Sequence, residues 1–150
     1  MTPPQAEDLK HTLSSVFQRK GSNGHYTRLF DSLDSSQRDI LLTSAAFRCG
    51  ELPIMANVRD RRDWLVLTTE RLVWCVGDET HELAINDIRD AVADFKVLQR
   101  TNQTKLQMHQ LQISTMSNQE FTINLEPGAP LSGVWSVLKN LGARNRRKVG

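Results

Sequence analysis

The stretch WLVLTTERLVWCVGDETHELAINDI, residues 64–88, decides the fold class of this chain. Its apolar runs are short and are separated by the polar pairs Thr69-Glu70 and Gly77-Asp78. Runs of this length bounded by turn residues are typical of antiparallel strands joined by tight turns. The stretch therefore predicts three strands and a brief helical turn, at residues 64–68, 71–76, 80–84 and 85–88.

Alternating apolar residues continue on both sides of this stretch. Before it, 52–58 predicts a strand with Pro53 near its start or on a sheet edge, and 59–63 is a charged turn. After it, 91–97 alternates as a strand and 99–104 is a polar loop. A hairpin around Ser117-Asn118 follows, with a bulge near His109-Gln110 where the alternation changes phase. Its two strands are predicted at 105–115 and 120–125.

Helical spacing replaces the alternation at both ends of the chain. Pro130 favours a helix start, and the helix is predicted to end at Gly142 with this apolar stripe: Leu131, Val134, Trp135, Leu138 and Leu141. Trp135, at the centre of that stripe, is expected in the core. Near the N-terminus a helix is predicted from Pro3 to Gly21, further helical turns over 26–33, and a second helix capped by Ser35 or Ser36 and ending at Gly50.

These elements predict an α+β fold: a bent antiparallel β-sheet or barrel capped by the C-terminal helix and preceded by N-terminal helices. We expect an N-terminal helical extension over 1–49, a sheet domain over 50–142 and a basic C-terminal tail over 143–150. The length of 150 residues suits one compact domain.

The 64–88 stretch resembles the bacterial pleckstrin-homology-like (PH-like) and GRAM-like domains. These carry an apolar strand ending in Leu-Thr, a turn with Arg, another apolar strand and an Ile-x-x-Ile segment. Here the features are Leu67-Thr68, Arg71, 72–76 and 85–88. The resemblance implies a PH-like fold over about 50–141 and a binding module, since that fold hosts lipid, peptide and self-association functions. It does not choose among them.

Composition sets the remaining expectations. The net charge is +2, and without the four basic residues of the tail it becomes −2, so the body of the chain is near neutral. Two cysteines and four scattered histidines show no metal-ligand spacing, and no nucleotide-binding or nucleophile motif is present. No secretory signal or membrane-spanning run is visible, which favours a cytoplasmic protein. We expect no enzymatic activity, cofactor or metal, and no nucleic acid as partner.

Two basic segments are candidate anion or lipid-headgroup sites. One is the predicted turn with Arg59, Arg61 and Arg62, where the interleaved Asp60 and Asp63 favour a simple solvated turn instead. The other is the tail, whose basic residues also suit an ordinary soluble C-terminus. Its candidates are Arg144, Arg146, Arg147 and Lys148.

The first helix is a candidate interaction surface. Its apolar stripe is Leu9, Leu13, Val16 and Phe17, followed by a loop over 20–24 that could let the helix move. Such a stripe must be buried on its own chain, on another subunit or in a membrane interface, and its mixed polar face disfavours the membrane. The leading hypothesis is therefore a protein-interaction or self-assembly module that uses this helix or a sheet edge. The alternative is a peripheral membrane or anionic-ligand binding module.

Overall fold

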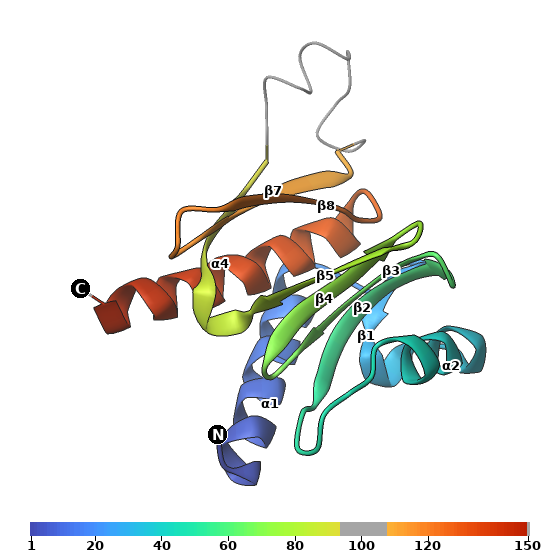
Figure 1. Cartoon of the computed structure of the whole chain (residues 1–150), viewed down its shortest axis with the longest axis horizontal. Coiled ribbons are helices and arrows are strands. Elements are labelled where there is room, and N and C mark those ends of the chain that lie inside the picture. Colours follow the sequence, from blue (N-terminus) through green and yellow to red (C-terminus); the bar gives the residue numbers. More distant parts are fainter. Residues whose placement is uncertain (94–107, 150) are drawn as a thin grey trace.

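The computed structural model describes residues 1–93 and 108–149, which form an α+β fold with two antiparallel sheets. The first sheet has the order β1-β2-β3-β4-β5 and the second the order β6-β7-β8 (Figure 1). The predicted antiparallel strands are confirmed, but the described strands do not close into a barrel. The strands are β1 (Thr27–Leu29), β2 (Pro53–Asp60), β3 (Asp63–Thr68), β4 (Arg71–Val76), β5 (Glu79–Ala84), β6 (Ile88–Val92), β7 (Gln110–Thr115) and β8 (Glu120–Asn124).

The helices are α1 (Pro3–Lys20), α2 (Ser35–Ser44) and α4 (Ala129–Val149), with 3-10 turns η1 (Phe30–Ser32) and η2 (Ile85–Asp87). Thr2 and Asp34 cap α1 and α2 by accepting bonds from the backbone N–H groups of Gln5 and Gln37. The cap of α2 is therefore Asp34, one residue before the predicted serines. The predicted turn at 85–88 is confirmed by η2. The predicted loop at 99–104 and parts of two predicted strands lie outside the described residues.

The central strands of the first sheet are buried on both faces. In the β3–β4 pair, Leu65 lies opposite Trp74 and Trp64 opposite Cys75. Leu65 and Trp74 face an inner core shared with the second sheet, α1 and α4, whereas Trp64 and Cys75 face an outer core under α2. Burial on both faces explains why these strands are nearly continuous apolar runs. The two tryptophans thus lie on opposite faces of the sheet.

The outer core is closed by the segment that joins α1 to the first sheet. Leu33 and Leu41 are buried there against Val66 and Val73 of the sheet, and α2 lies across that face in Figure 1. The prediction of helical turns over 26–33 is confirmed only for η1. Residues 27–29 before it form β1, which pairs with Met55–Asn57 of β2. A three-residue strand leaves little periodic signal, so its partner strand rather than its own sequence sets its conformation.

The first helix packs on its own chain. Leu13, Val16 and Phe17 belong to the inner core, and the Phe17 side chain is only 1% exposed. Gly133 of α4 makes this contact possible, because a Cβ atom there would lie 2.6 Å from the Phe17 ring. Gly21 is similarly pressed against the α4 backbone, where a Cβ atom would clash with the carbonyl oxygen of Ala129. The loop over 20–24 is therefore a packed connection and gives the helix no visible freedom to move.

The last helix is longer than predicted. It continues past Gly142 to Val149, so Arg144–Lys148 are helical and do not form a separate tail. Asn145 explains the extension, since its buried Nδ2 donates to the carbonyl oxygens of Ile85 and Ile88, both at 2.7 Å. Trp135 is half-buried at the margin of the core rather than at its centre, and its Nε1 donates to Ala91 O at 2.7 Å.

A carboxylate holds β1 against the end of β8. Glu126 accepts hydrogen bonds from the backbone N–H groups of His25, Tyr26 and Thr27, at 2.8, 2.7 and 2.9 Å. Burial opposes the charged form of Glu126, but these three bonds and the nearby His25 outweigh it and lower the pKa of the carboxyl group. The contact joins segments about 100 residues apart in the chain.

We expect Phe17→Ala to lower the free energy of unfolding by about 3–5 kcal/mol, because it empties a large buried site between α1 and α4. Urea denaturation measures the change, and Gln18→Ala, at an exposed neighbouring position, is the matched control. A midpoint that moves no more than that of the control would contradict burial of α1. Deletion of residues 1–20 should likewise destabilise the sheet.

Glu126→Gln should lower the free energy of unfolding by about 1–3 kcal/mol at neutral pH, because hydrogen bonds to a charged acceptor are replaced by weaker ones. The folded pKa lies below the unfolded value of 4.5, so the stabilisation is complete above that value and is lost as pH falls through the folded pKa. Urea unfolding at neutral pH and near pH 3 should therefore show a gap between wild type and variant that narrows in acid. An equal gap at both pH values would exclude a charged Glu126 as its cause.

Candidate functional site

The turn between β2 and β3 holds the first group of candidate residues. Arg59 lies over the Tyr26 ring, 4.5 Å from its centroid, and 4.0 Å from the Asp63 carboxylate. Arg62 pairs with Asp78 at 2.6 Å. Arg61, by contrast, makes no ion pair with any residue that the structure describes. Two of the three arginines in this turn thus lie near aspartates. Arg61 has no acidic partner among the residues that the structure describes, so its charge is available to a ligand.

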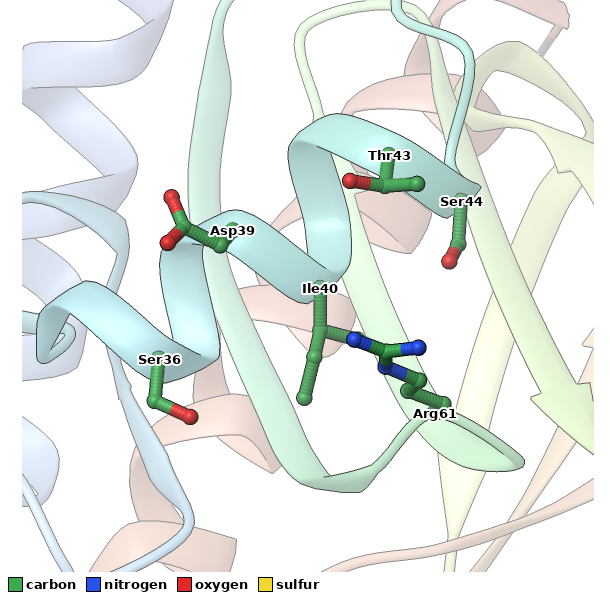
Figure 2. Close-up of a pocket in the computed structure, with 6 residues that line it drawn as sticks. All are labelled: Ser36, Asp39, Ile40, Thr43, Ser44 and Arg61. Atoms are coloured by element: carbon green, nitrogen blue, oxygen red, sulfur yellow. The ribbon is translucent and has the colours of Figure 1, made fainter.

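Arg61 contributes to a groove beside α2 that we call the α2 groove (Figure 2). The helical residues at its wall recur at intervals of three and four, so they share one face of α2. Its volume is about 500 Å³, and its lining is Ser36, Asp39, Ile40, Thr43, Ser44 and Arg61.

Three hydroxyl groups and one guanidinium could donate hydrogen bonds to a polar ligand in the α2 groove. The carboxylate of Asp39 on the same wall opposes a simple anion. The sequence indicated Arg61 as a candidate but not the residues of α2. The spacing of these α2 residues shows only that they share a helix face, and it does not show that Arg61 lies opposite them.

The basic residues at the end of α4 point in different directions. Arg146 donates to the carbonyl oxygen of Arg89 and lies 4.0 Å from Asp90, and Arg147 donates to Ala143 O within its own helix. Arg144 is held by Asn140, with Nε 2.8 Å from Oδ1. Arg144 and Lys148 line a groove.

That groove lies between α1, η2 and α4, and we call it the helical groove. It measures about 480 Å³ and is lined by Met1, Gln5, Asp8, Leu9, Thr12, Ile85, Asn86, Leu141, Arg144, Asn145 and Lys148. The structure thus brings together Leu9, from the proposed interaction helix, and two cations from the predicted tail. The rest of the interaction stripe, Leu13, Val16 and Phe17, lies inside the core instead.

The two basic segments do not form one surface. In Figure 1 the β2–β3 turn and the C-terminal end of α4 lie at opposite ends of the view. A flat membrane contact that used both segments at once would have to span the molecule.

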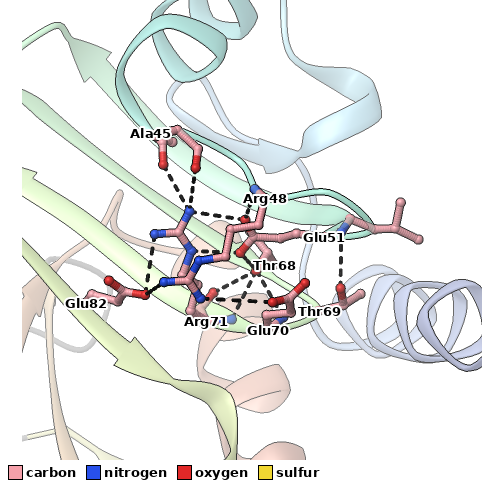
Figure 3. A network of polar contacts seen from close by, with 10 residues as sticks. Ala45, Arg48, Glu51, Thr68, Thr69, Glu70, Arg71 and Glu82 are labelled. Carbon is pink, nitrogen blue, oxygen red and sulfur yellow. Dashed lines mark hydrogen bonds and ion pairs between the residues drawn. The ribbon is translucent and has the colours of Figure 1, made fainter. Parts of the chain in front are cut away.

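A buried ion pair stabilises the turn between β3 and β4 (Figure 3). Arg71 contacts the Glu51 carboxylate through Nε at 2.8 Å and Nη2 at 3.1 Å, and Nη2 also donates to the carbonyl oxygens of Ala45 and Ala46. Burial opposes the charge on Glu51, but bonds from Arg71, Thr68 and the Arg48 N–H lower the pKa of its carboxyl group. Both charges are satisfied within the chain, so Arg71 is a structural residue. Nothing in the sequence around Glu51 marked it as the partner.

The described residues contain no group of three or more His, Cys, Asp or Glu side chains placed to hold a metal ion. Cys49 is exposed and Cys75 is buried. None of the helices in the described ranges is long and apolar enough to cross a membrane. No family model, curated protein or solved structure matches the chain.

Arg71→Met should lower the free energy of unfolding by about 3–5 kcal/mol, because it leaves the Glu51 carboxylate buried without its cation. Adding Glu51→Leu should recover part of this stability. The free energy of unfolding should therefore fall by less in the double variant than the two decreases measured for the single variants added together. Urea unfolding of all three measures the coupling, with exposed Arg48→Met expected to cost less than about 1 kcal/mol. Strictly additive losses would show that Arg71 and Glu51 are not coupled.

Proposed function

We propose that this chain is a non-enzymatic PH-like interaction module that binds an extended polypeptide segment at the outer edge of β5. Element order supports the PH-like assignment: four consecutive antiparallel strands β2–β5, three more in β6–β8, and a final helix. That helix packs along β6, through contacts such as Trp135 Nε1 to Ala91 O. The elements α1, β1 and α2 are additions to this core.

Two of the other sheet edges, those of β1 and β6, are occupied by side chains. Along β1, the N–H groups of Tyr26 and Thr27 bond to Glu126, and that of Leu29 bonds to Asn23 Oδ1 at 2.9 Å. Along β6, the carbonyl oxygens accept hydrogen bonds from three residues of α4, namely Trp135, Asn145 and Arg146. A partner strand could add at either edge only after these bonds were broken.

Strand β8 is also restricted. Its residues Thr122–Asn124 lie against β3 and β4, and the space between them measures only about 10 Å³. That volume holds about one water molecule, so β8 lies close against β3 and β4 along Thr122–Asn124.

The outer edge of β5 is different, and this observation carries the proposal. Val76 and Glu79 flank the two-residue turn at Gly77-Asp78 and pair with each other. In such a hairpin alternate residues bond to the neighbouring strand, which leaves the backbone groups of Thr80, Glu82 and Ala84 pointing outward. In the described ranges no hydrogen bond reaches these outward groups. An edge of this kind is a template for a partner strand.

The distribution of charge favours a polypeptide over a membrane as the partner at this end of the molecule. The arginines of the adjacent β2–β3 turn are largely paired with aspartates, as described above. The stripe of α1 is occupied inside the core, so it supports self-assembly less than an open edge does. A second copy of the chain is one possible source of the added strand.

Thr80→Pro tests the proposal, because it removes one outward N–H group and keeps the ladder to β4, in which Thr80 does not bond. Ten-residue peptides selected from a random library on the full-length protein should bind the variant about tenfold more weakly, through lost main-chain bonds. Thr80→Val, which keeps the N–H, should bind as the wild type does. Selected peptides that bind Thr80→Pro equally well would place the contact elsewhere. Light scattering on the same proteins shows whether a second copy supplies the strand.

A further inference from the structure

The helical groove combines an apolar floor with cations at one end. Leu9 of α1, Ile85 of η2 and Leu141 of α4 contribute apolar side chains, and Arg144 and Lys148 contribute the charge. The groove volume of about 480 Å³ lies in the range of small-molecule sites, roughly 300–1,000 Å³. None of these features depends on the β5 edge or on the PH-like assignment.

The two cations are arranged for one ligand group. Arg144 and Lys148 are four residues apart, so they lie on the same face of α4. The bond from Arg144 Nε to Asn140 orients the guanidinium and leaves its other four N–H donors available. Neither cation pairs with an acid in the described part of the chain, and Asp8 is the only acid that lines the groove. Basic residues at a helix C-terminus interact favourably with the helix dipole whichever way their side chains point. The dipole therefore does not explain why these two side chains line the groove.

The walls of the groove favour an acyl chain over a peptide. Between their ends, α1 and α4 satisfy their backbone N–H and C=O groups within the helix. A peptide in the groove would therefore find backbone partners only at the first turn of α1 and the last turn of α4. Unpaired polar groups are costly to bury, whereas a hydrocarbon chain needs no such partners. Apart from the two cations, the groove is lined by five polar side chains, and Nδ2 of one of them, Asn145, already donates to Ile85 and Ile88. They do not form the regular row of donors and acceptors that a strand edge offers. The five are Gln5, Asp8, Thr12, Asn86 and Asn145.

We propose that the helical groove binds an anionic amphiphile through its head group and one acyl chain. Its carboxylate or phosphate head group contacts Arg144 and Lys148, and its acyl chain lies along Leu9, Ile85 and Leu141. Such a molecule could be free in solution or part of a membrane lipid, and both sources share this chemistry.

Isothermal titration of the full-length protein with dodecanoate and with dodecyl phosphate, each below its micelle concentration, tests the proposal. Wild type should bind, and Arg144→Gln combined with Lys148→Gln should weaken binding at least about tenfold through lost charge-assisted bonds. Arg147→Gln is the matched control, because Arg147 lies one residue from the pair and bonds to its own helix; its affinity should equal that of wild type. Acetate and inorganic phosphate, which lack the chain, should not bind measurably.

A second variant tests the chain site separately from the charges. Thr12→Phe fills the groove and should weaken both amphiphiles while the cations remain, with circular dichroism confirming that each variant is folded. Sedimentation with phosphatidylcholine vesicles that contain phosphatidylserine identifies the source of the amphiphile. If the protein pellets with the vesicles, and pelleting requires Arg144, Lys148 and an unfilled groove, the ligand is a membrane lipid. If the protein binds only the soluble amphiphiles, the ligand is a free molecule. The proposal is overturned if wild type binds neither probe, or if the double variant or Thr12→Phe binds as tightly as wild type.

Discussion

Strands β2, β3 and β4 bury both of their faces, and the rest of the molecule is arranged to cover them. On the inner face lie residues such as Leu65, Leu67 and Trp74, and on the outer face Trp64, Val66 and Val73. A sheet with two apolar faces needs a layer on each side. The second sheet with α4 and α1 supplies one layer, and α2 supplies the other. The N-terminal segment is therefore part of both cores, which is why Phe17 and Leu41 are as deeply buried as the strands.

Polar contacts between distant segments hold these layers in register. Glu126 fixes β1 to the end of β8, Glu51 and Arg71 fix the chain after α2 to the β3–β4 turn, and Asn145 fixes α4 to η2. Each is buried or half-buried and each bonds to several groups. Apolar packing is non-directional, whereas these bonds require particular atoms to meet. They select the arrangement in which the layers pack.

The same contacts determine which surfaces remain for a partner. Side chains from α4 and Glu126 occupy two sheet edges, so the outward groups of β5 stand out among the described edges. The charges divide in a similar way. The arginines of the β2–β3 turn are largely paired, whereas Arg144 and Lys148 near the end of α4 line the helical groove. In Figure 1 the C-terminal end of α4 and the β2–β3 turn lie at opposite ends of the view. A polypeptide site at β5 and an amphiphile site at the helical groove would not overlap in residues.

The sequence by itself determined the elements whose signal is local. Short apolar runs bounded by turn residues over 64–84 defined β3, β4 and β5. The spacing from Leu131 to Leu141 defined most of α4, because that pattern spans enough residues to show its period. Tertiary structure decided the rest. Residues 27–29 became β1 because β2 offers them a pairing edge. Helix α4 continued through Arg144–Lys148 because Asn145 donates to the carbonyl oxygens of Ile85 and Ile88. Of the candidate site residues, the sequence named the cations and Leu9. The sequence already placed Asp63 next to Arg59 in the same turn. Only the fold could decide that Arg62 pairs with Asp78 and that Arg144 and Lys148 line a groove with Leu9, because these contacts join residues far apart in the chain.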